Sequence, residues 1–201
     1  MPSLVDTKRA LHGAWAIARR DPGAMSRFDL TVEGFWGSFF AAVVAAPGYL
    51  LLLVDQYAVQ GLGANLGEVA LVELLAYAAG WIAFPLLALP ITQALGLGHR
   101  YVPLVVASNW GSVLQVALLV AFTVLATVLP EAMHVSLRLA VMLVALAYQW
   151  QVVRVSLETT GLIAAGLVIV DILVAVIIQR GAGALIQPAD AILQPGAEPI
   201  V

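Results

Sequence analysis

The sequence predicts an all-α integral membrane protein in which five membrane-spanning helices follow an amphipathic amino-terminal helix. Hydrophobic residues make up 62% and charged residues 10% of its 201 residues. A typical soluble chain has about 25% charged residues, so this one cannot cover a water-exposed surface. The segment from Val102 to Leu129 contains no Lys, Arg, Asp, Glu or His. As a helix rising about 1.5 Å per residue, it is longer than a hydrocarbon layer of roughly 30 Å.

Residues 1–33 are the most charged part of the chain and are predicted to form a cytoplasmic amphipathic segment. A helix over Lys8–Arg20 separates a basic side from an apolar side, with Trp15 at the boundary. The basic side consists of Lys8, Arg9, His12, Arg19 and Arg20, and the apolar side of Ala10, Leu11, Ala14, Ile17 and Ala18. Two interpretations are open: an interfacial helix whose basic side and Trp15 contact the membrane surface, or a helix packed on the protein.

Five apolar runs account for residues 34–180, which form the predicted transmembrane domain. The predicted spans are Gly34–Val54, Leu71–Leu95, Val102–Leu129, Leu137–Val155 and Gly161–Ile178. The first two are joined by a predicted loop, Asp55–Glu68. Pro85 and Pro90 lack backbone donors, so the second span is expected to be kinked or broken. Residues 181–201 are rich in Gly, Pro, Ala and Gln and are predicted to be a flexible tail.

The nine Lys and Arg residues predict the orientation of the chain. With five spans and a cytoplasmic amino terminus, seven of them lie on the inner side, namely Lys8, Arg9, Arg19, Arg20, Arg27, Arg100 and Arg154. Only Arg138 and Arg180 lie on the outer side. Because basic residues collect on the cytoplasmic side of membrane proteins, the carboxyl terminus is predicted to be periplasmic.

Polar residues at membrane depth are the candidates for a functional site. By helical rise, Gln115 and Asp171 fall near mid-depth, whereas Asn109, Gln149 and Gln151 fall closer to the inner face. An ionised carboxylate at the bilayer centre costs at least about 2.5 kcal/mol, so Asp171 must face protein, water or a proton. It is either a proton or cation site with Gln115 as neighbour, or a buried acid bonded across helices. The second interpretation is favoured because no other acid or base shares its depth, and the four amides are expected to form interhelical hydrogen bonds.

Other catalytic or metal-binding chemistry is nearly absent from the sequence. The chain has no cysteine, and His12, His99 and His134 belong to different segments, so no three-histidine metal cluster is expected. No nucleophile and base lie at a shared depth. The sequence therefore predicts a protein that is not an enzyme and needs no cofactor.

The segment Gly96–Trp110 has a short glycine-bearing loop, GLGHRY, followed by the apolar run VPLVVASNW with its polar and aromatic break. This arrangement resembles bacterial members of the Yip-domain family, and the turn Val153–Gly161 before the last span is similar as well. The resemblance implies five spans and a cytoplasmic amino terminus. The Asp-Leu-Tyr-Gly-Pro element of eukaryotic members is reduced here to Asp29-Leu30. The resemblance therefore carries over neither partner binding linked to GTPases nor catalytic residues.

Two functions follow as hypotheses for an inner-membrane protein of this kind. The first is non-enzymatic binding or assembly of other membrane components, with the lipid bilayer and a membrane protein or second copy as partners, and no nucleic acid. The alternative is a small transporter or membrane-embedded substrate-binding subunit that uses Asp171 and Gln115. A water-accessible pocket lined by both residues would favour the transporter, whereas helix packing that occludes both would favour assembly.

Overall fold

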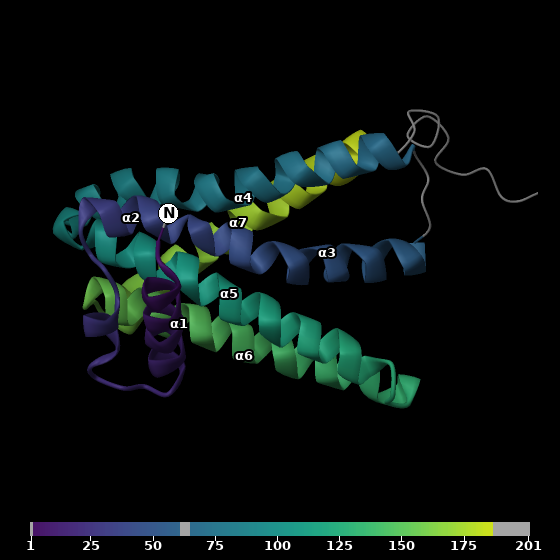
Figure 1. The fold of residues 1–201 in the computed structure, drawn as a ribbon, viewed down its shortest axis with the longest axis horizontal. Helices are drawn as coiled ribbons and strands as arrows, with labels where there is room; N and C mark the ends of the chain where they lie inside the picture. The colour runs from purple at the N-terminus through teal and green to yellow at the C-terminus, as the bar shows by residue number, and fades with distance from the viewer. Residues whose placement is uncertain (1, 61–64, 187–201) are drawn as a thin grey trace, which may run out of the picture.

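The structure, a computed structural model, describes residues 2–60 and 65–186, which fold into a helical bundle (Figure 1). Its helices are α1 (Leu4–Ala18), η1 (Ala24–Arg27), α2 (Val32–Ser38), α3 (Phe40–Gln60), α4 (Leu66–Ala94), η2 (Gly98–Arg100), α5 (Tyr101–Ala126), α6 (Glu131–Leu157) and α7 (Gly161–Ile186). Five stretches are long and apolar enough to cross a membrane: α2 with α3, α4, η2 with α5, α6 and α7. The predicted fold class is confirmed, and the chain is an integral membrane protein.

Helix α5 lies at the centre of the bundle. It packs on α3 and α6 along its length and also contacts α1, α2 and α4, whereas α7 packs on α4 and α6. Every residue of α5 from Pro103 to Gly111 is buried, and none beyond Gly111 is. Figure 1 shows why: near α1 the long helices lie close together, and toward the other end α4 and α7 diverge from α5 and α6. We call these the α1 end and the far end.

The first two spans differ from their predicted limits. The first consists of α2 and α3, which are separated at Phe39, and α3 continues to Gln60. Helix α4 begins at Leu66, after Asn65 accepts a hydrogen bond from the Gly67 N–H at 2.9 Å. The predicted loop Asp55–Glu68 is therefore too long, because the polar residues at both of its ends continue the helices beyond the apolar runs.

The later spans also differ at their ends. Helix α4 remains continuous through Pro85 and Pro90, so of the expected kink or break, the break is absent. Helix α5 ends at Ala126 instead of Leu129, since Pro130 disfavours a helical residue directly before it. Helix α7 extends to Ile186, so the first residues of the predicted tail are helical. The remainder of that tail, 187–201, lies outside the described residues.

Helix α1 crosses the bundle at a steep angle and packs on it (Figure 1). Ala10, Gly13, Ala14, Ala16 and Ile17 are buried, and α1 contacts α5, α6 and η1. The structure thus shows the second predicted interpretation, a helix packed on the protein. The basic residues of α1 are nevertheless exposed, as are Ala18, expected on the packed side, and Trp15, which is 56% exposed. Contact of this exposed side with lipid stays a prediction.

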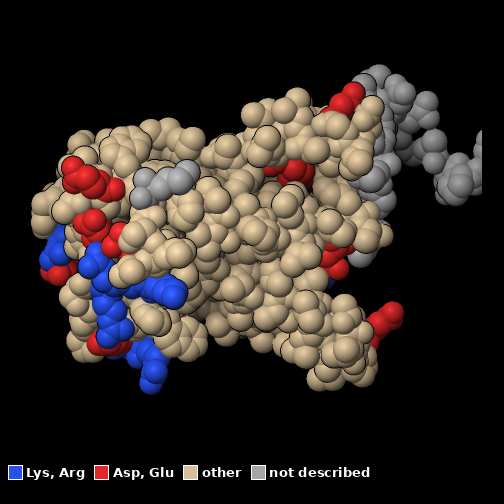
Figure 2. All heavy atoms as spheres, viewed as in Figure 1, with Lys and Arg blue, Asp and Glu red and all other residues tan. Residues whose placement is uncertain are grey.

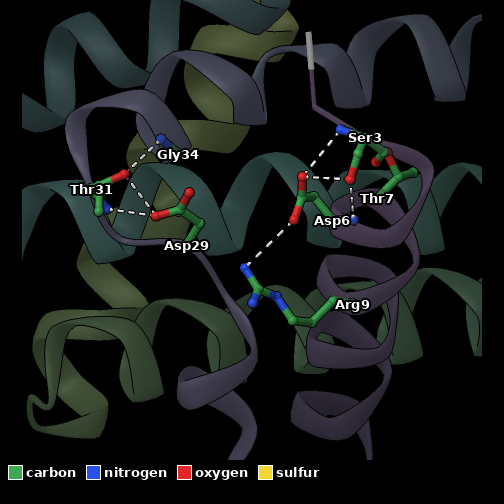
Figure 3. A network of polar contacts seen from close by, with 7 residues as sticks. All are labelled: Ser3, Asp6, Thr7, Arg9, Asp29, Thr31 and Gly34. Carbon is green, nitrogen blue, oxygen red and sulfur yellow. Dashed lines mark hydrogen bonds and ion pairs between the residues drawn. The ribbon is translucent and has the colours of Figure 1, made fainter.

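The starts of α1 and α2 are held by polar contacts (Figure 3). At α1, Ser3 Oγ accepts from the Asp6 N–H, while the Ser3 N–H donates back to the Asp6 carboxylate, both at 3.1 Å. At α2, Thr31 Oγ1 accepts from the Gly34 N–H at 3.1 Å and donates to Asp29 at 2.7 Å. Hydrogen bonds from Ser3 and Thr31 lower the pKa of Asp6 and Asp29. These bonds stabilise the fold above about pH 4, and their contribution is lost as the pH falls through the lowered pKa values.

The glycine at the start of α2 has no room for a side chain. A Cβ at Gly34 would lie 2.2 Å from the backbone oxygen of Asp29, whereas a Cβ at Gly37 would have nothing within 4 Å. We predict that Gly34→Ala lowers the free energy of unfolding by about 1–3 kcal/mol, because the backbone must move. Gly37→Ala should leave it unchanged or raise it by up to about 1 kcal/mol through helix propensity. Thermal unfolding in detergent measures both, and equal stabilities would contradict the prediction.

Candidate functional site

A large cavity of about 1030 Å³ lies between α3, α4, α5, α6 and α7 in the half of the bundle away from α1. Its lining reaches the far end, where Figure 2 shows a recess in the surface. The polar residues of the lining are Asp55, Gln56, Tyr57, Glu73, Gln115, Thr123, Arg138, Gln149, Asp171 and Gln179. Both predicted central residues, Asp171 and Gln115, therefore line one cavity.

Three of these side chains form a hydrogen-bonded chain across α5, α6 and α7. Gln115 Nε2 donates to Gln149 Oε1 at 2.8 Å, and Gln149 Nε2 donates to Asp171 Oδ2 at 3.1 Å. Helical rise alone separated Gln149 from the other two into a different polar level, and this separation is wrong. Side chains lean toward the amino terminus of their own helix. Helix α6 runs opposite to α5 and α7, so Gln149 leans toward the far end, whereas Gln115 and Asp171 lean toward the α1 end. The side chains on α5 and α7 can therefore meet Gln149.

The other two predicted amides do not join this chain. Asn109 Nδ2 donates to Ser38 Oγ at 2.8 Å and so connects α5 to α2 near the α1 end, an interhelical bond of the kind expected. Gln151 is half-buried and lies in neither cavity described here, and no hydrogen bond to its side chain is present among residues 2–60 and 65–186. Two residues along α6 turn it by about 200°, which directs Gln149 and Gln151 to different sides.

Glu73 is a buried acid of the same cavity that the sequence analysis did not single out. Only 5% of it is exposed, and its carboxylate accepts hydrogen bonds from Tyr49 Oη at 3.0 Å and Tyr57 Oη at 2.7 Å. Asp171 is thus not the only acid that lines this cavity. The cavity runs along the helices, so residues at several depths line it. A carboxylate near the start of an apolar run was visible in the sequence, but its tyrosine partners were not.

A small cavity of about 270 Å³ adjoins the large one. Four residues line both cavities, namely Gln149, Asp171, Ala175 and Gln179. The lining also includes Asn109 and Ser108, whose hydroxyl is buried and has no hydrogen-bond partner among the described residues. A buried hydroxyl without a partner costs about 1–3 kcal/mol, so this group is available to a ligand or water.

The predicted membrane-surface residues lie apart from both cavities. Lys8, Arg9, Trp15, Arg19 and Arg20 are exposed at the α1 end. Most of the basic atoms visible in Figure 2 gather there. At the same end, Arg100 pairs with Glu158 and joins the connection before α5 to the one before α7.

In the part of the chain that the structure describes, no three His, Asp or Glu side chains come together in a way that could hold a metal ion. The large cavity instead combines carboxylates, amides and apolar walls, a lining that can bind a small solute by hydrogen bonds and charge.

No family model, curated protein or solved structure matches this chain. The resemblance to the Yip-domain family therefore stays a prediction, and the assignment of function depends on the geometry of the cavities.

The two glutamines of α6 provide a matched pair for testing the hydrogen-bonded chain. We predict that Gln149→Leu lowers the free energy of unfolding by about 1–3 kcal/mol, because it removes two interhelical bonds of about 0.6–2 kcal/mol each. Gln151→Leu should change it by less than about 0.5 kcal/mol. Unfolding of the purified variants in detergent is the measurement, and an equal loss in both would argue against the chain.

Proposed function

We propose that this chain is a non-enzymatic, multi-pass inner-membrane protein that binds a small solute in the large cavity, as a transporter or as the membrane-embedded subunit of one. The observation that carries the proposal is that Asp171 and Gln115 line one large cavity instead of being occluded by helix packing. Polar side chains facing a water-accessible space at membrane depth are typical of substrate and ion routes.

The charges of the large cavity favour a cationic solute or protons. Asp55, Glu73 and Asp171 line it together with one basic residue, Arg138. With all four ionised, the lining carries an excess of negative charge. In a cavity with low-dielectric walls, such an excess raises the local concentration of cations.

The distribution of basic residues supports an orientation with the α1 end in the cytoplasm. Seven of the nine Lys and Arg residues belong to segments at that end. The large cavity then faces the periplasm, and the packed half of α5 separates it from the cytoplasm.

The hypothesis of assembly is supported by a different surface. The exposed basic side of α1 offers a contact for anionic lipid or an acidic membrane partner. This role does not use the cavity, which is why we place solute binding first.

Water access to the large cavity can be tested with single cysteines, because the natural sequence has none. Ala145 lines the cavity, whereas Ala147, two residues along the same helix, is exposed and lines neither cavity. A thiol reacts as thiolate, which needs water. We predict that a charged, membrane-impermeant thiol reagent added from the periplasmic side modifies Ala145→Cys at least about tenfold faster than Ala147→Cys.

Addition of the reagent from the other side of oriented vesicles is the control for orientation. Faster reaction of Ala145→Cys from the cytoplasmic side would reverse the proposed orientation but keep the cavity. Equally slow reaction of both variants from both sides would overturn the proposed solute site.

Asp171 can be tested as a coupling group by neutral substitution. In liposomes with an inward-directed membrane potential, the wild-type protein should carry protons or cations inward, followed by an internal pH dye or by cation uptake. Asp171→Asn should lose most of this flux, because the amide holds no charge to exchange. Glu131→Gln, an exposed acid at the far end, is the control and should behave as wild type. Equal flux in all three proteins would exclude Asp171 as the coupling group.

A further inference from the structure

We propose that the small cavity is a binding site for a small organic ammonium ion, an inference that rests on the proposed function and names its substrate class. Four aromatic residues from α3 and α4 line this cavity, namely Tyr49, Tyr77, Trp81 and Phe84. The rings of Tyr49 and Tyr77 lie 4.5 Å apart, and those of Tyr77 and Trp81 lie 6.0 Å apart at 70°. The Tyr49 and Tyr77 rings are inclined to each other by 32°. The face of an aromatic ring attracts a cation, including one that carries apolar substituents.

The tyrosine rings are fixed by bonds that their hydroxyl groups make elsewhere. Tyr49 donates to Glu73, and Tyr77 donates to the backbone oxygen of Ala42 at 2.6 Å. The hydroxyl groups are therefore already paired, and the rings are held in position without a ligand. Pre-organised rings lose little conformational entropy when a ligand binds.

One carboxylate complements this aromatic lining. Asp171 is the only acid that lines the small cavity, and no Lys, Arg or His lines it with Asp171 in the described part of the chain. One oxygen of Asp171 accepts from Gln149, and the other accepts no hydrogen bond from residues 2–60 and 65–186, so it is left for a ligand. A single carboxylate among apolar and aromatic groups matches a monovalent organic cation, whereas Mg²⁺ and Ca²⁺ need six or more oxygen ligands.

Ser108 indicates a polar substituent on the ligand. Its hydroxyl is buried, lines the small cavity and has no partner in the described residues, although the neighbouring Ser112 bonds to the Ser108 backbone oxygen at 3.0 Å. Asn109 donates one of its two amide hydrogens to Ser38, and among the described residues nothing donates to its side-chain oxygen, which can therefore also accept from a ligand. With about 270 Å³, the cavity is at the lower limit of ligand pockets, so the ammonium compound is small.

The lining that the two cavities share gives the proposed route to this site. Gln149, Asp171, Ala175 and Gln179 separate the two cavities and line both. A cation drawn in by the acids of the large cavity reaches Asp171 first and then the aromatic rings. The large cavity thus acts as the approach, and the small one as the site of recognition.

Binding is tested on the full chain in a maltoside detergent, which has no ammonium group. We expect choline and tetramethylammonium to raise the melting temperature in a saturable way. The uncharged carbon analogue of choline, 3,3-dimethylbutanol, should not. Asp171→Asn and Trp81→Leu should each weaken binding at least about tenfold, and Trp36→Leu, an exposed tryptophan of α2, is the matched control and should bind as wild type.

The hydroxyl of Ser108 gives an independent readout that does not depend on the folding of the other variants. Ser108→Ala removes a group without a partner, so the free protein should be as stable as wild type or more so. It should lose affinity for choline but not for tetramethylammonium, which has no hydroxyl. Dihexanoylphosphatidylcholine distinguishes the source of the ammonium group: stronger binding than choline indicates a lipid headgroup, and weaker binding indicates a free solute.

Saturable binding that requires the charge and Trp81 supports the proposal. No saturable effect of either ammonium ion, or the same effect from 3,3-dimethylbutanol, would overturn it. If Ala145→Cys is still modified from the periplasm in that case, the proposed solute site in the large cavity stands and only the ammonium class fails.

Discussion

A hydrocarbon layer offers no water to buried polar groups, so each polar side chain in this bundle must find a partner in the protein or face a hydrated cavity. Two of the side chains that meet this requirement by joining helices line the large cavity. Gln149 of α6 bonds to α5 and α7, and Glu73 of α4 bonds to two tyrosines of α3. One polar cluster thus joins α5, α6 and α7, the other joins α3 and α4, and both face the same cavity. The groups that hold the helices together are also those that a solute would meet.

The packing of α5 determines where that cavity can form. Near the α1 end, small, branched and aromatic side chains bury α5, and α1 adds a layer through Ala14 and Ile17. Toward the far end no residue of α5 is buried, and the neighbouring helices diverge. A bundle closed at one end and separated at the other leaves access from one side only. Access to the opposite side would require the helices of the closed half to move.

The sequence predicted the fold class and the five spans because length and charge decide whether a helix crosses a membrane. It placed Asp171 and Gln115 near mid-depth and made them neighbours only under the interpretation of a proton or cation site. It missed Glu73 and the tyrosines, since depth says nothing about which sides of two helices face each other. The ends of the helices were also misjudged at Asp55, where polar residues extend a helix past the hydrocarbon. Hydropathy measures contact with lipid, and it does not measure where a helix stops.

Asp171 must meet two requirements that conflict, one from the fold and one from the proposed route. For the fold, its carboxylate must be bonded, and Gln149 supplies a single hydrogen bond at 3.1 Å. For a route between the cavities, the same carboxylate must be able to exchange that partner. A fully satisfied acid would favour stability and block exchange, whereas an unbonded acid would be too costly at this depth. Gln149, which is itself hydrogen-bonded to Gln115, gives Asp171 one neutral partner. This arrangement is intermediate between a fully satisfied and an unbonded carboxylate. A ligand that replaces the Gln149 amide with a charged donor would form a stronger bond to Asp171, because hydrogen bonds between two charged groups are roughly twice as strong as those between neutral groups.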